Sequence, residues 1–231
     1  MNIVITGTHK GLGKAIAEYY LMKGNTVFGC SRNASSIEHD LYHHFVADVS
    51  EEKDVIEFGR FVRQNTKTID GLINNAGVSS MNHFLLTPVE TAKRLMNINY
   101  FGTFLCIREF VPLLRKSGHG RIVNFSTQAV PLRLAGEMAY GASKSAVESL
   151  TKVLAKELAG FKITVNAVGP PPIKTDLTAK VPQEKMDRLL ESMAIPRFGE
   201  PRDVINVINF FLNEESDLVT GQVVYLGGVI D

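Results

Sequence analysis

The stretch from residue 124 to residue 144, NFSTQAVPLRLAGEMAYGASK, contains a phenol, an ammonium group and two adjacent hydroxyls. Tyr140 and Lys144 are four residues apart, so on a helix they lie one turn apart on the same face. A cation beside a phenol favours the phenolate, and we therefore expect Lys144 to lower the pKa of Tyr140. A phenol tuned in this way exchanges a proton with a substrate oxygen near neutral pH, which predicts general acid–base chemistry at Tyr140.

A donor hydroxyl close to this phenol would hold the same substrate oxygen and stabilise the charge that develops on it. Ser126 and Thr127 lie about a dozen residues before Tyr140. Because adjacent residues of a strand point to opposite faces, the two side chains cannot serve equally. These residues by themselves leave open which hydroxyl takes part.

Short β-branched runs alternate along the chain with longer stretches of helical period. The runs predict strands at 2–6, 26–31, 43–48, 71–77, 121–126, 162–168 and 222–226, and the longer stretches predict helices at 12–24, 51–65, 88–116, 139–159 and 201–213. Such alternation is typical of βαβ units, in which helices cover both faces of a parallel sheet. We predict an α/β fold with one doubly wound parallel sheet of about seven strands, in a single domain over residues 1–231. The polar, weakly helical segment 175–200 follows a strand end and is predicted to be a substrate lid.

A glycine-rich turn, TGTHKGLG, follows the first predicted strand and has glycines at positions 7, 11 and 13. Glycine permits a tight turn and close approach of the backbone, and the helix that follows presents free N–H groups to a pyrophosphate. No Gly-Lys-Ser/Thr sequence follows, so a Rossmann-type site for a dinucleotide fits better than a site for a nucleoside triphosphate.

The second strand ends in GCSRN, where an acidic residue would hold the two ribose hydroxyls of NAD. This chain has Ser31 and Arg32 there, and Lys10 supplies a second cation in the first loop. Both charges suit a 2′-phosphate, which favours NADP as the cofactor.

In combination these motifs resemble the short-chain dehydrogenase/reductase family over nearly the whole chain. TGTHKGLG resembles its TGxxxGxG loop, ADVS at 47–50 its adenine contact, NNAG at 74–77 its fourth-strand motif, NINYFG at 97–102 its central-helix Asn, and YGASK at 140–144 its YxxxK pair. The C-terminal part, from IPRFGEPRD to VVYLGG, is similar to the β-ketoacyl-carrier-protein reductase branch.

The resemblance implies an NADP-dependent oxidoreductase that moves hydride between nicotinamide and a ketone or secondary alcohol, including 3-oxoacyl thioesters. Tyr140 would be the general acid and base, assisted by Lys144, and Asn99 would hold a water that links Lys144 to solvent. In the family a Ser stands thirteen residues before the Tyr, and here that position is Thr127. We assign Thr127 to hold the carbonyl oxygen, with Ser126 as the fallback if a bulge shifts the register.

The resemblance also implies which residues contact the cofactor. The implied contacts are Gly7, Thr8, Lys10, Gly11, Leu12, Gly13, Ser31, Arg32, Asp48, Val49, Asn75, Ala76, Gly77, Tyr140, Lys144, Pro170, Ile173 and Thr175. Two positions depart from the family pattern: Pro171 stands where a Gly is usual, and Gly227 replaces a polar residue. Proline fixes φ and has no N–H, so a backbone that needs a positive φ there could not accept it.

Two alternatives to a ketone reductase remain open, the second of them motivated by Pro171 and Thr127. One is a dehydrogenase of a small biosynthetic hydroxy compound, and the other is a dinucleotide-binding regulator that keeps the fold without turnover. An intact Tyr140–Lys144 pair argues against the regulator, since a protein without turnover does not need a phenol whose pKa is adjusted for proton transfer.

The composition limits the partners. Lys plus Arg number 25 and Asp plus Glu 24, so the formal charge of +1 provides no broad basic field for nucleic acid or an anionic membrane. Cys30 and Cys106 lie in apolar runs without metal-ligand spacing, so we expect reduced core residues and no metal site. With no leader or long apolar stretch in the sequence, we expect a cytoplasmic protein.

The substrate side is expected to be mostly apolar, which suits a lipophilic carbonyl, either free or carried on acyl carrier protein or coenzyme A. Arg115 and Lys116, at the end of the predicted helix 88–116, could meet an acidic carrier protein, although helix-end preferences alone also explain them. The resemblance implies a homodimer or homotetramer formed through helices 88–116 and 139–159.

Overall fold

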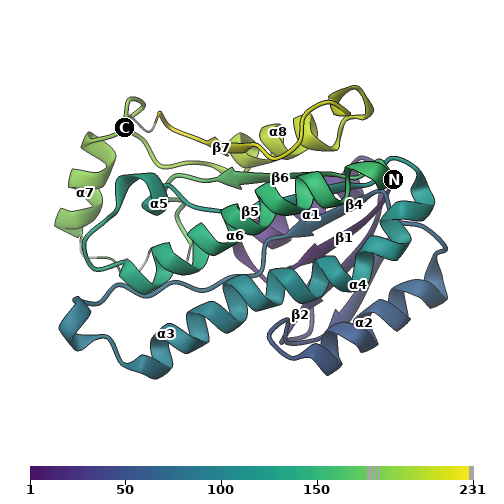
Figure 1. Ribbon diagram of the computed structural model, residues 1–231, viewed down its shortest axis with the longest axis horizontal. Coiled ribbons are helices and arrows are strands. Elements are labelled where there is room, and N and C mark those ends of the chain that lie inside the picture. Colours follow the sequence, from purple (N-terminus) through teal and green to yellow (C-terminus); the bar gives the residue numbers. More distant parts are fainter. Residues whose placement is uncertain (176–177, 179–180, 182, 229–231) are drawn as a thin grey trace.

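Seven parallel strands form one sheet in the order β3-β2-β1-β4-β5-β6-β7, and helices cover both of its faces (Figure 1). The computed structural model describes residues 1–175, 178, 181 and 183–228. The strands are β1 Asn2–Thr6, β2 Thr26–Ser31, β3 Tyr42–Val46, β4 Gly71–Asn74, β5 Arg121–Phe125, β6 Thr164–Gly169 and β7 Val223–Tyr225. The strand order reverses between β1 and β4, and a crevice opens beyond the carboxyl ends of the strands at such a point. The predicted doubly wound α/β fold is confirmed.

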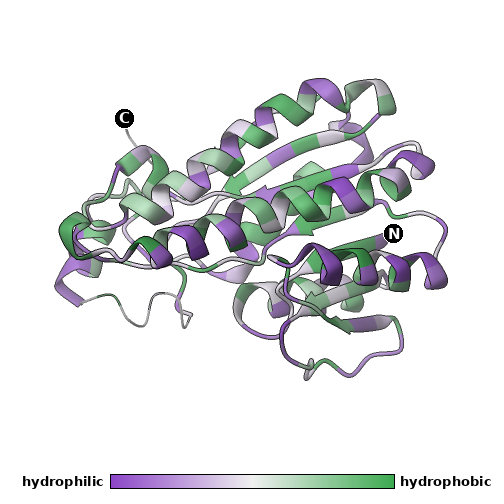
Figure 2. Cartoon of the chain, turned by 60° about the horizontal axis from the view of Figure 1, so that its bottom comes forward, coloured by the Kyte–Doolittle hydropathy of each residue, from purple (hydrophilic) through white to green (hydrophobic). Residues whose placement is uncertain are grey.

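Each face of the sheet is covered by its own set of helices and its own apolar cluster. Helices α1 (Gly11–Met22) and α8 (Pro201–Leu212) pack on one face, where Ile16 and Ile208 are completely buried. Helices α2 (Glu52–Asn65), α4 (Gly102–Ser117) and α6 (Met138–Glu157) pack on the other, around residues such as Phe58 and Phe110. Figure 2 shows apolar strands between helices whose outer faces are polar, the amphipathic pattern that such layers require.

The predicted helix 88–116 consists of three parts. Helix α3 (Val89–Leu95) continues into a π-helical turn, η2 (Met96–Phe101), and then into α4. The hydroxyl of Thr103 donates to the carbonyl oxygen of Asn99 over 2.8 Å, and π turns of this kind are frequent at functional sites. Asn99 is fully buried. Helical periodicity alone does not reveal the π turn.

Two helices were not predicted as separate elements. Helix α5 (Ala129–Leu132) has four residues, too few to show a period, and α7 (Gln183–Glu191) lies inside the predicted lid 175–200. Residues 176–177, 179–180 and 182 of that lid lie outside the described residues. After α7 the chain returns to the sheet, where the N–H of Ile195 donates to the carbonyl oxygen of Gly227 over 3.1 Å.

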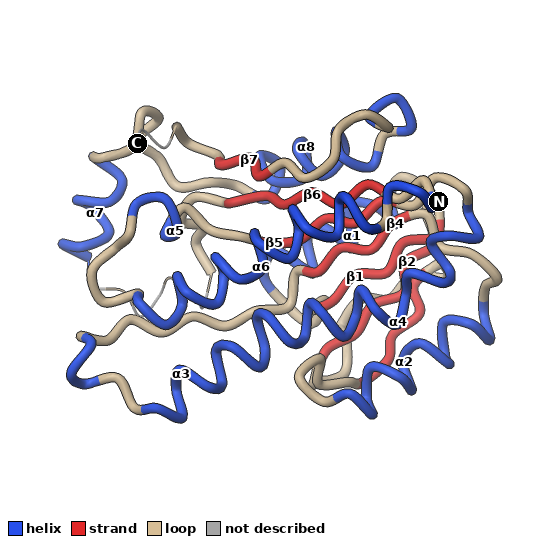
Figure 3. The backbone as a smooth tube through the Cα atoms, viewed as in Figure 1, coloured by secondary structure: helices blue, strands red, loops and turns tan. Residues whose placement is uncertain are grey.

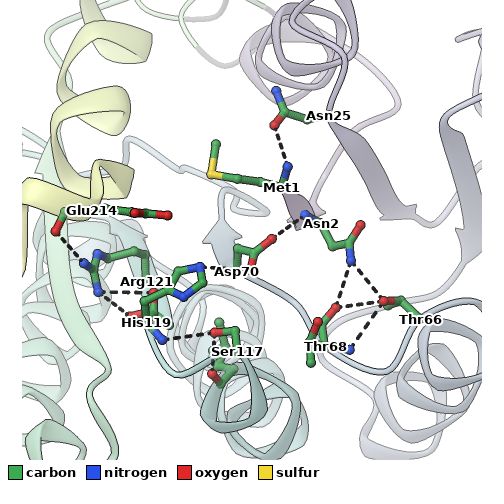
Figure 4. Close-up of polar contacts among 12 residues, drawn as sticks. Met1, Asn2, Asn25, Thr66, Thr68, Asp70, Ser117, His119, Arg121 and Glu214 are labelled. Atoms are coloured by element: carbon green, nitrogen blue, oxygen red, sulfur yellow. Dashed lines mark hydrogen bonds and ion pairs between the residues drawn. The ribbon is translucent and has the colours of Figure 1, made fainter.

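The amino edge of the sheet is fixed by polar contacts (Figure 4). The Asp70 carboxylate accepts the N–H of Asn2 over 2.7 Å and lies 3.2 Å from Nε2 of His119. The Arg121 guanidinium donates to the carbonyl oxygens of His119 and Glu214, each over 3.2 Å. These contacts join the starts of strands and their loops at the edge of the sheet opposite the crevice, so we assign them a structural role.

Candidate active site

The predicted acid–base pair lies at the start of α6, beyond the end of β5 (Figure 3). Tyr140 stands in the first turn of this helix and is half-buried, and the Thr127 hydroxyl is close enough to its phenol to act on the pKa of that phenol. Lys144, one turn later, is only 5% exposed, and its Nζ donates to the carbonyl oxygen of Phe125 over 2.8 Å. The structure therefore brings Tyr140, Thr127 and Lys144 together at the carboxyl edge of the sheet.

Burial shifts the pKa values of both ionisable groups. It raises the pKa of Tyr140 to about 12, while the hydrogen bond from Thr127 acts in the opposite direction. Burial also lowers the pKa of Lys144 to about 8. Our expectation of a lowered pKa for Tyr140 is therefore wrong for the protein alone, because burial has the largest effect on the phenol and the nearby charge of Glu137 also raises its pKa. The Lys144 ammonium is bound to the carbonyl oxygen of Phe125.

The two candidate hydroxyls have different surroundings. Ser126 is 3% exposed and donates to the Glu148 carboxylate, which also accepts the hydroxyl of Tyr225 over 2.6 Å. The pairing of β5 with β6 runs without a bulge to Phe125, its last residue. Beyond this end Ser126 contacts Glu148 in the interior, whereas the Thr127 hydroxyl acts on the phenol of Tyr140, which favours Thr127 over the Ser126 fallback.

Asn99 braces the segment that follows β4. Its Oδ1 accepts the N–H of Val78 and its Nδ2 donates to the carbonyl oxygen of the same residue, each over 2.9 Å. Nδ2 also donates to the Ser143 hydroxyl on α6 over 2.9 Å. A Cβ at Gly77 would lie 3.2 Å from Oδ1 of Asn99 and 3.4 Å from Nζ of Lys144, so a glycine lets this segment approach both groups.

The glycine-rich loop forms the cradle that the sequence predicts for a pyrophosphate. Gly7 has a φ of +78° and Gly11 a φ of +59°. A Cβ at Gly13 would collide with the carbonyl oxygen of Gly7, so only glycine permits this packing of α1 on β1. The Asn75 amide donates to the carbonyl oxygen of Thr6 over 2.9 Å and ties the end of β4 to the loop. These features fit an adenine dinucleotide.

Beyond this loop lies a cavity of about 610 Å³. Its walls come from the start of α1, the segment after β6 and the start of α8, namely Gly11, Leu12, Ile173, Lys174, Thr175, Arg197, Phe198, Gly199, Glu200 and Pro201. The Lys174 ammonium lies over the Phe198 ring, 5.0 Å from its centroid, and the Arg197 guanidinium makes two contacts of 2.7 and 2.9 Å with Asp203. Four of these residues, Gly11, Leu12, Ile173 and Thr175, were predicted to contact the cofactor. Lys174, Arg197 and Phe198 were not, although Arg197 and Phe198 belong to the IPRFGEPRD stretch that resembles the reductase branch.

Pro171 fits the backbone without a positive φ. Within the described part of the chain, the non-glycine residues with positive φ are Arg133 and Lys162. Pro171 is buried against Gly199, and a Cβ on Gly199 would lie 2.7 Å from Cγ of Pro171. The other departure, Gly227, has a φ of +89° and no room for a Cβ beside Met193. Both departures thus have a steric explanation in this fold.

The predicted adenosine end lies where the first loop meets the end of β2. Lys10 and Arg32 are exposed, and Ser31 is half-buried. Thr8 is completely buried, and its N–H donates to the carbonyl oxygen of Cys30 over 3.2 Å. Thr8 therefore supports the loop from behind, and its side chain does not face the crevice.

The remaining predicted contacts follow β3, β4 and β6. Asp48 accepts the N–H of Ser50 over 3.0 Å, and Val49 is buried against Gly102. The N–H of Ala76 donates to the Thr6 hydroxyl over 2.9 Å, and the carbonyl oxygen of Pro170 accepts the N–H of Gln128 over 3.4 Å. These residues hold the crevice walls to the strand ends.

Other candidates lie away from this site. Arg115 stands over the Phe161 ring, 4.5 Å from its centroid, at the end of α4 that leads to the amino edge of the sheet. A carrier protein delivering substrate to Tyr140 would therefore not meet Arg115 or Lys116. Cys30 and Cys106 are buried free thiols, as predicted, and burial raises the pKa of both. Over the described ranges, no group of three or more His, Cys, Asp or Glu residues could hold a metal ion, and no helix could cross a membrane.

The amino-acid sequence of this chain is similar to those of known oxidoreductases. A family model described as short chain dehydrogenase matches residues 1–186. A 3-oxoacyl-acyl-carrier-protein reductase from Thermotoga maritima is 34% identical over 237 residues, covering 97% of this chain and 95% of the relative. The chloroplastic NADPH-dependent aldehyde reductase 2 of Arabidopsis thaliana is 30% identical, covering 97% of this chain and 92% of the relative.

Similar structures support the same relationship. Ligand-free aldohexose dehydrogenase from Thermoplasma acidophilum superposes with a TM-score of 0.90 at 27% identity, covering 98% of this chain and 92% of the other. The 3-ketoacyl-acyl-carrier-protein reductase of Brucella melitensis, in complex with NADH, superposes with a TM-score of 0.91 at 26% identity, covering 98% and 96%.

Proposed function

This chain belongs to the short-chain dehydrogenase family and is an oxidoreductase, and from that premise we propose that it is an NADP-dependent ketone reductase. The observation that carries the proposal is the grouping of Tyr140, the Thr127 hydroxyl that acts on its phenol, and the buried Lys144 bound to the carbonyl oxygen of Phe125. We propose Asn99, Thr127, Tyr140 and Lys144 as the catalytic group. A protonated phenol is the form of Tyr140 that a reduction requires.

Tyr140 is suited to give a proton. With its pKa raised to about 12, the phenol is protonated at pH 7 and can donate to a carbonyl oxygen. A reduced nicotinamide, when bound, supplies the hydride. The Thr127 hydroxyl would hold the same oxygen as negative charge develops on it. Lys144, protonated below its pKa of about 8, would stabilise the phenolate that remains.

Proton return to Tyr140 would pass through Lys144. The Lys144 ammonium donates to the carbonyl oxygen of Phe125, and both the ammonium and the Asn99 side chain lie close to Gly77. We propose that Asn99 holds a water between Lys144 and solvent and that its own amide contacts with Val78 and Ser143 keep it in place.

The proposed cofactor preference rests on charge at the adenosine end. Arg32 and Lys10 stand where a 2′-phosphate would bind, and no acidic side chain follows β2 to hold ribose hydroxyls. The Arabidopsis thaliana relative is named for its dependence on NADPH, whereas the Brucella melitensis structure contains NADH. Because these two proteins differ in cofactor, the proposal for NADP rests on Arg32 and Lys10 of this chain.

Two substrate classes have support. The reductases of Thermotoga maritima and Brucella melitensis act on 3-oxoacyl groups of acyl carrier protein, which favours a 3-oxoacyl thioester on acyl carrier protein or coenzyme A. The aldohexose dehydrogenase of Thermoplasma acidophilum favours the alternative, a small hydroxy compound. A regulator without turnover is the third candidate, and the Tyr140–Thr127 contact argues against it.

We further propose a cytoplasmic homodimer or homotetramer assembled through α4 and α6, with segment 175–200 as the substrate lid. In support of the assembly, Phe101 just before α4 is 47% exposed and Val153 on α6 is 50% exposed. Exposed apolar side chains on neighbouring helices suit a contact between copies of the chain.

The test follows NADPH absorbance with an acetoacetyl thioester as acceptor, in wild type, Tyr140→Phe and Thr127→Ala. Consumption by wild type that both substitutions abolish supports the ketone reductase. A parallel assay with NADP⁺ and a panel of sugars and small alcohols tests the second substrate class. Tight NADPH binding with no turnover in either assay would contradict both and leave the regulator.

A further inference from the structure

The turn that follows β2, residues 31–36, is held by side chains from outside it. Nδ1 of His9, in the glycine-rich loop, lies 2.7 Å from the carbonyl oxygen of Ala34. The Lys14 ammonium on α1 donates to the Ser36 hydroxyl over 2.9 Å. The 31–36 turn carries Ser31 and Arg32, and so its position determines where the proposed 2′-phosphate contacts stand.

A chain of hydrogen bonds reaches the same turn from β3. The hydroxyls of Thr8 and Tyr42 are 2.8 Å apart, and the Tyr42 hydroxyl lies 2.9 Å from Nδ1 of His44. On the other side of the ring, Nε2 of His44 lies 3.0 Å from the carbonyl oxygen of Asn33 and 3.3 Å from the Ser31 hydroxyl. We call this series, Thr8 to Tyr42 to His44 to Asn33, the β3 relay.

The partners fix the direction of the β3 relay. A carbonyl oxygen can only accept, so Nε2 of His44 carries the hydrogen toward Asn33, and Nδ1 accepts from the Tyr42 hydroxyl. Burial lowers the pKa of His44, which keeps the ring neutral at pH 7 and consistent with one N–H. The Tyr42 hydroxyl, having donated to His44, accepts from Thr8.

The sheet leaves space for this relay at one residue. Gly29 of β2 pairs with His44 of β3, and a Cβ at Gly29 would collide with both the Tyr42 and the Thr8 hydroxyls. The neighbouring His43 points to the opposite face, where its ring stacks on Phe28 with centroids 5.1 Å apart. Only one of the two adjacent histidines therefore reaches the turn.

We propose that the β3 relay, with His44 at its centre, positions the 31–36 turn for the 2′-phosphate of an adenine dinucleotide and so sets the preference for NADPH over NADH. The inference rests on the proposed NADP preference and adds a residue to it. His44 is a positioning residue, because it acts through Ser31 and Asn33.

The test measures dissociation constants of NADPH and NADH by fluorescence titration of the reduced nicotinamide. Wild type is compared with His44→Phe, which removes both ring nitrogens, with Tyr42→Phe, which removes one hydroxyl, and with the matched control His43→Phe. We expect His44→Phe to weaken NADPH binding about tenfold, as one or two lost hydrogen bonds would, and NADH binding less than about twofold. Tyr42→Phe should have a smaller effect of the same kind, and His43→Phe none.

A conservative variant separates positioning from general damage. In His44→Gln the amide nitrogen can replace Nε2 as donor to Asn33, so NADPH affinity should return to within about threefold of wild type. Equal loss of NADPH and NADH affinity in His44→Phe, or unchanged affinity in His44→Phe and Tyr42→Phe, would overturn the inference. If His44→Phe does not fold, Tyr42→Phe and His44→Gln decide the matter. A wild type that binds NADH as tightly as NADPH would refute the proposed cofactor preference itself, a failure visible before any variant is made.

Discussion

The two ends of the crevice are built in different ways. At the catalytic end, Lys144 is 5% exposed and burial moves its pKa and that of Tyr140 in opposite directions, each toward the uncharged form. At the adenosine end, the cations Lys10 and Arg32 stay exposed, while neutral groups of the β3 relay lie beneath the turn. The catalytic end shields its ionisable groups from water. The adenosine end leaves its cations exposed to water, and hydrogen bonds beneath the turn hold it in position.

The difference indicates what each end can control. A buried acid–base pair governs proton transfer, since its protonation state depends on the surrounding protein. An exposed cation on a hydrogen-bonded turn governs binding. Water and salt weaken its long-range field, so the strength of its interaction with a ligand depends on how closely the turn places it to that ligand. Substitutions at the catalytic end should therefore change rate, and substitutions at the adenosine end should change cofactor affinity.

The largest expected effect is at Tyr140. Tyr140→Phe keeps the ring but removes the proton donor, so kcat should fall by a factor of about 10³ to 10⁴. NADPH affinity, measured by fluorescence titration, should fall far less than kcat, because the substitution removes at most one contact to the cofactor and leaves the adenosine end untouched. Residual turnover above one tenth of wild type would show that another group donates the proton.

Thr127 comes next. Thr127→Ala removes a donor to the developing charge and the hydrogen bond that opposes the raised pKa of Tyr140, so kcat should fall about 100-fold. Thr127→Ser keeps the hydroxyl and should recover most of the rate. Ser126→Ala is the comparison, since its hydroxyl binds Glu148 on the interior side and its loss should cost stability more than rate. A larger loss of kcat in Ser126→Ala than in Thr127→Ala would reverse the assignment.

Arg32 tests the other end. Arg32→Ala should raise the dissociation constant of NADPH about tenfold and leave that of NADH nearly unchanged, because only the former carries a 2′-phosphate. The loss should shrink as salt is added, since the cation is exposed. Lys116→Ala removes an exposed cation at the opposite edge of the sheet and serves as the control. Equal effects of the two substitutions would mean that net charge alone explains the result.

The smallest expected effect is on stability as a function of pH. The folded protein holds the pKa of Lys144 at about 8, below its ordinary value of 10.5, so between these values the unfolded chain binds more protons and stability rises with pH. Between pH 8 and 9 the gain from this group should be about 1 kcal/mol. Urea unfolding at the two pH values should show that wild type and Lys152→Met, an exposed lysine of α6, gain this amount relative to Lys144→Met. The comparison cancels the opposite contribution of the buried Cys30 and Cys106 thiols, whose raised pKa values are common to all three proteins. An equal change with pH in Lys144→Met would assign the gain to another group.

Local patterns in the sequence predict most of the fold and part of the site. The strands, the helices that cover them, the glycine-rich loop and the position of Tyr140 one turn before Lys144 follow from spacing along a few residues. The π turn at 96–101 does not follow, since the apolar residues of 88–116 are read as one continuous helix and no residue type marks the place of a π turn. The predicted direction of the pKa shift of Tyr140 is wrong, because the spacing of two residues indicates how close they lie but not how far each is shielded from water.

The doubly wound α/β sheet, its dinucleotide loop and the Tyr–Lys pair can all be predicted from the sequence, because helix and strand periods and glycine-rich turns are local properties. Other features depend on the folded chain: Thr127 meets the phenol, Pro171 packs on Gly199, and His44 reaches the turn after β2. Each of these contacts joins elements brought together only by the pairing of strands or by burial in the crevice. Burial and register are properties of the assembled sheet, and no short stretch of sequence contains them.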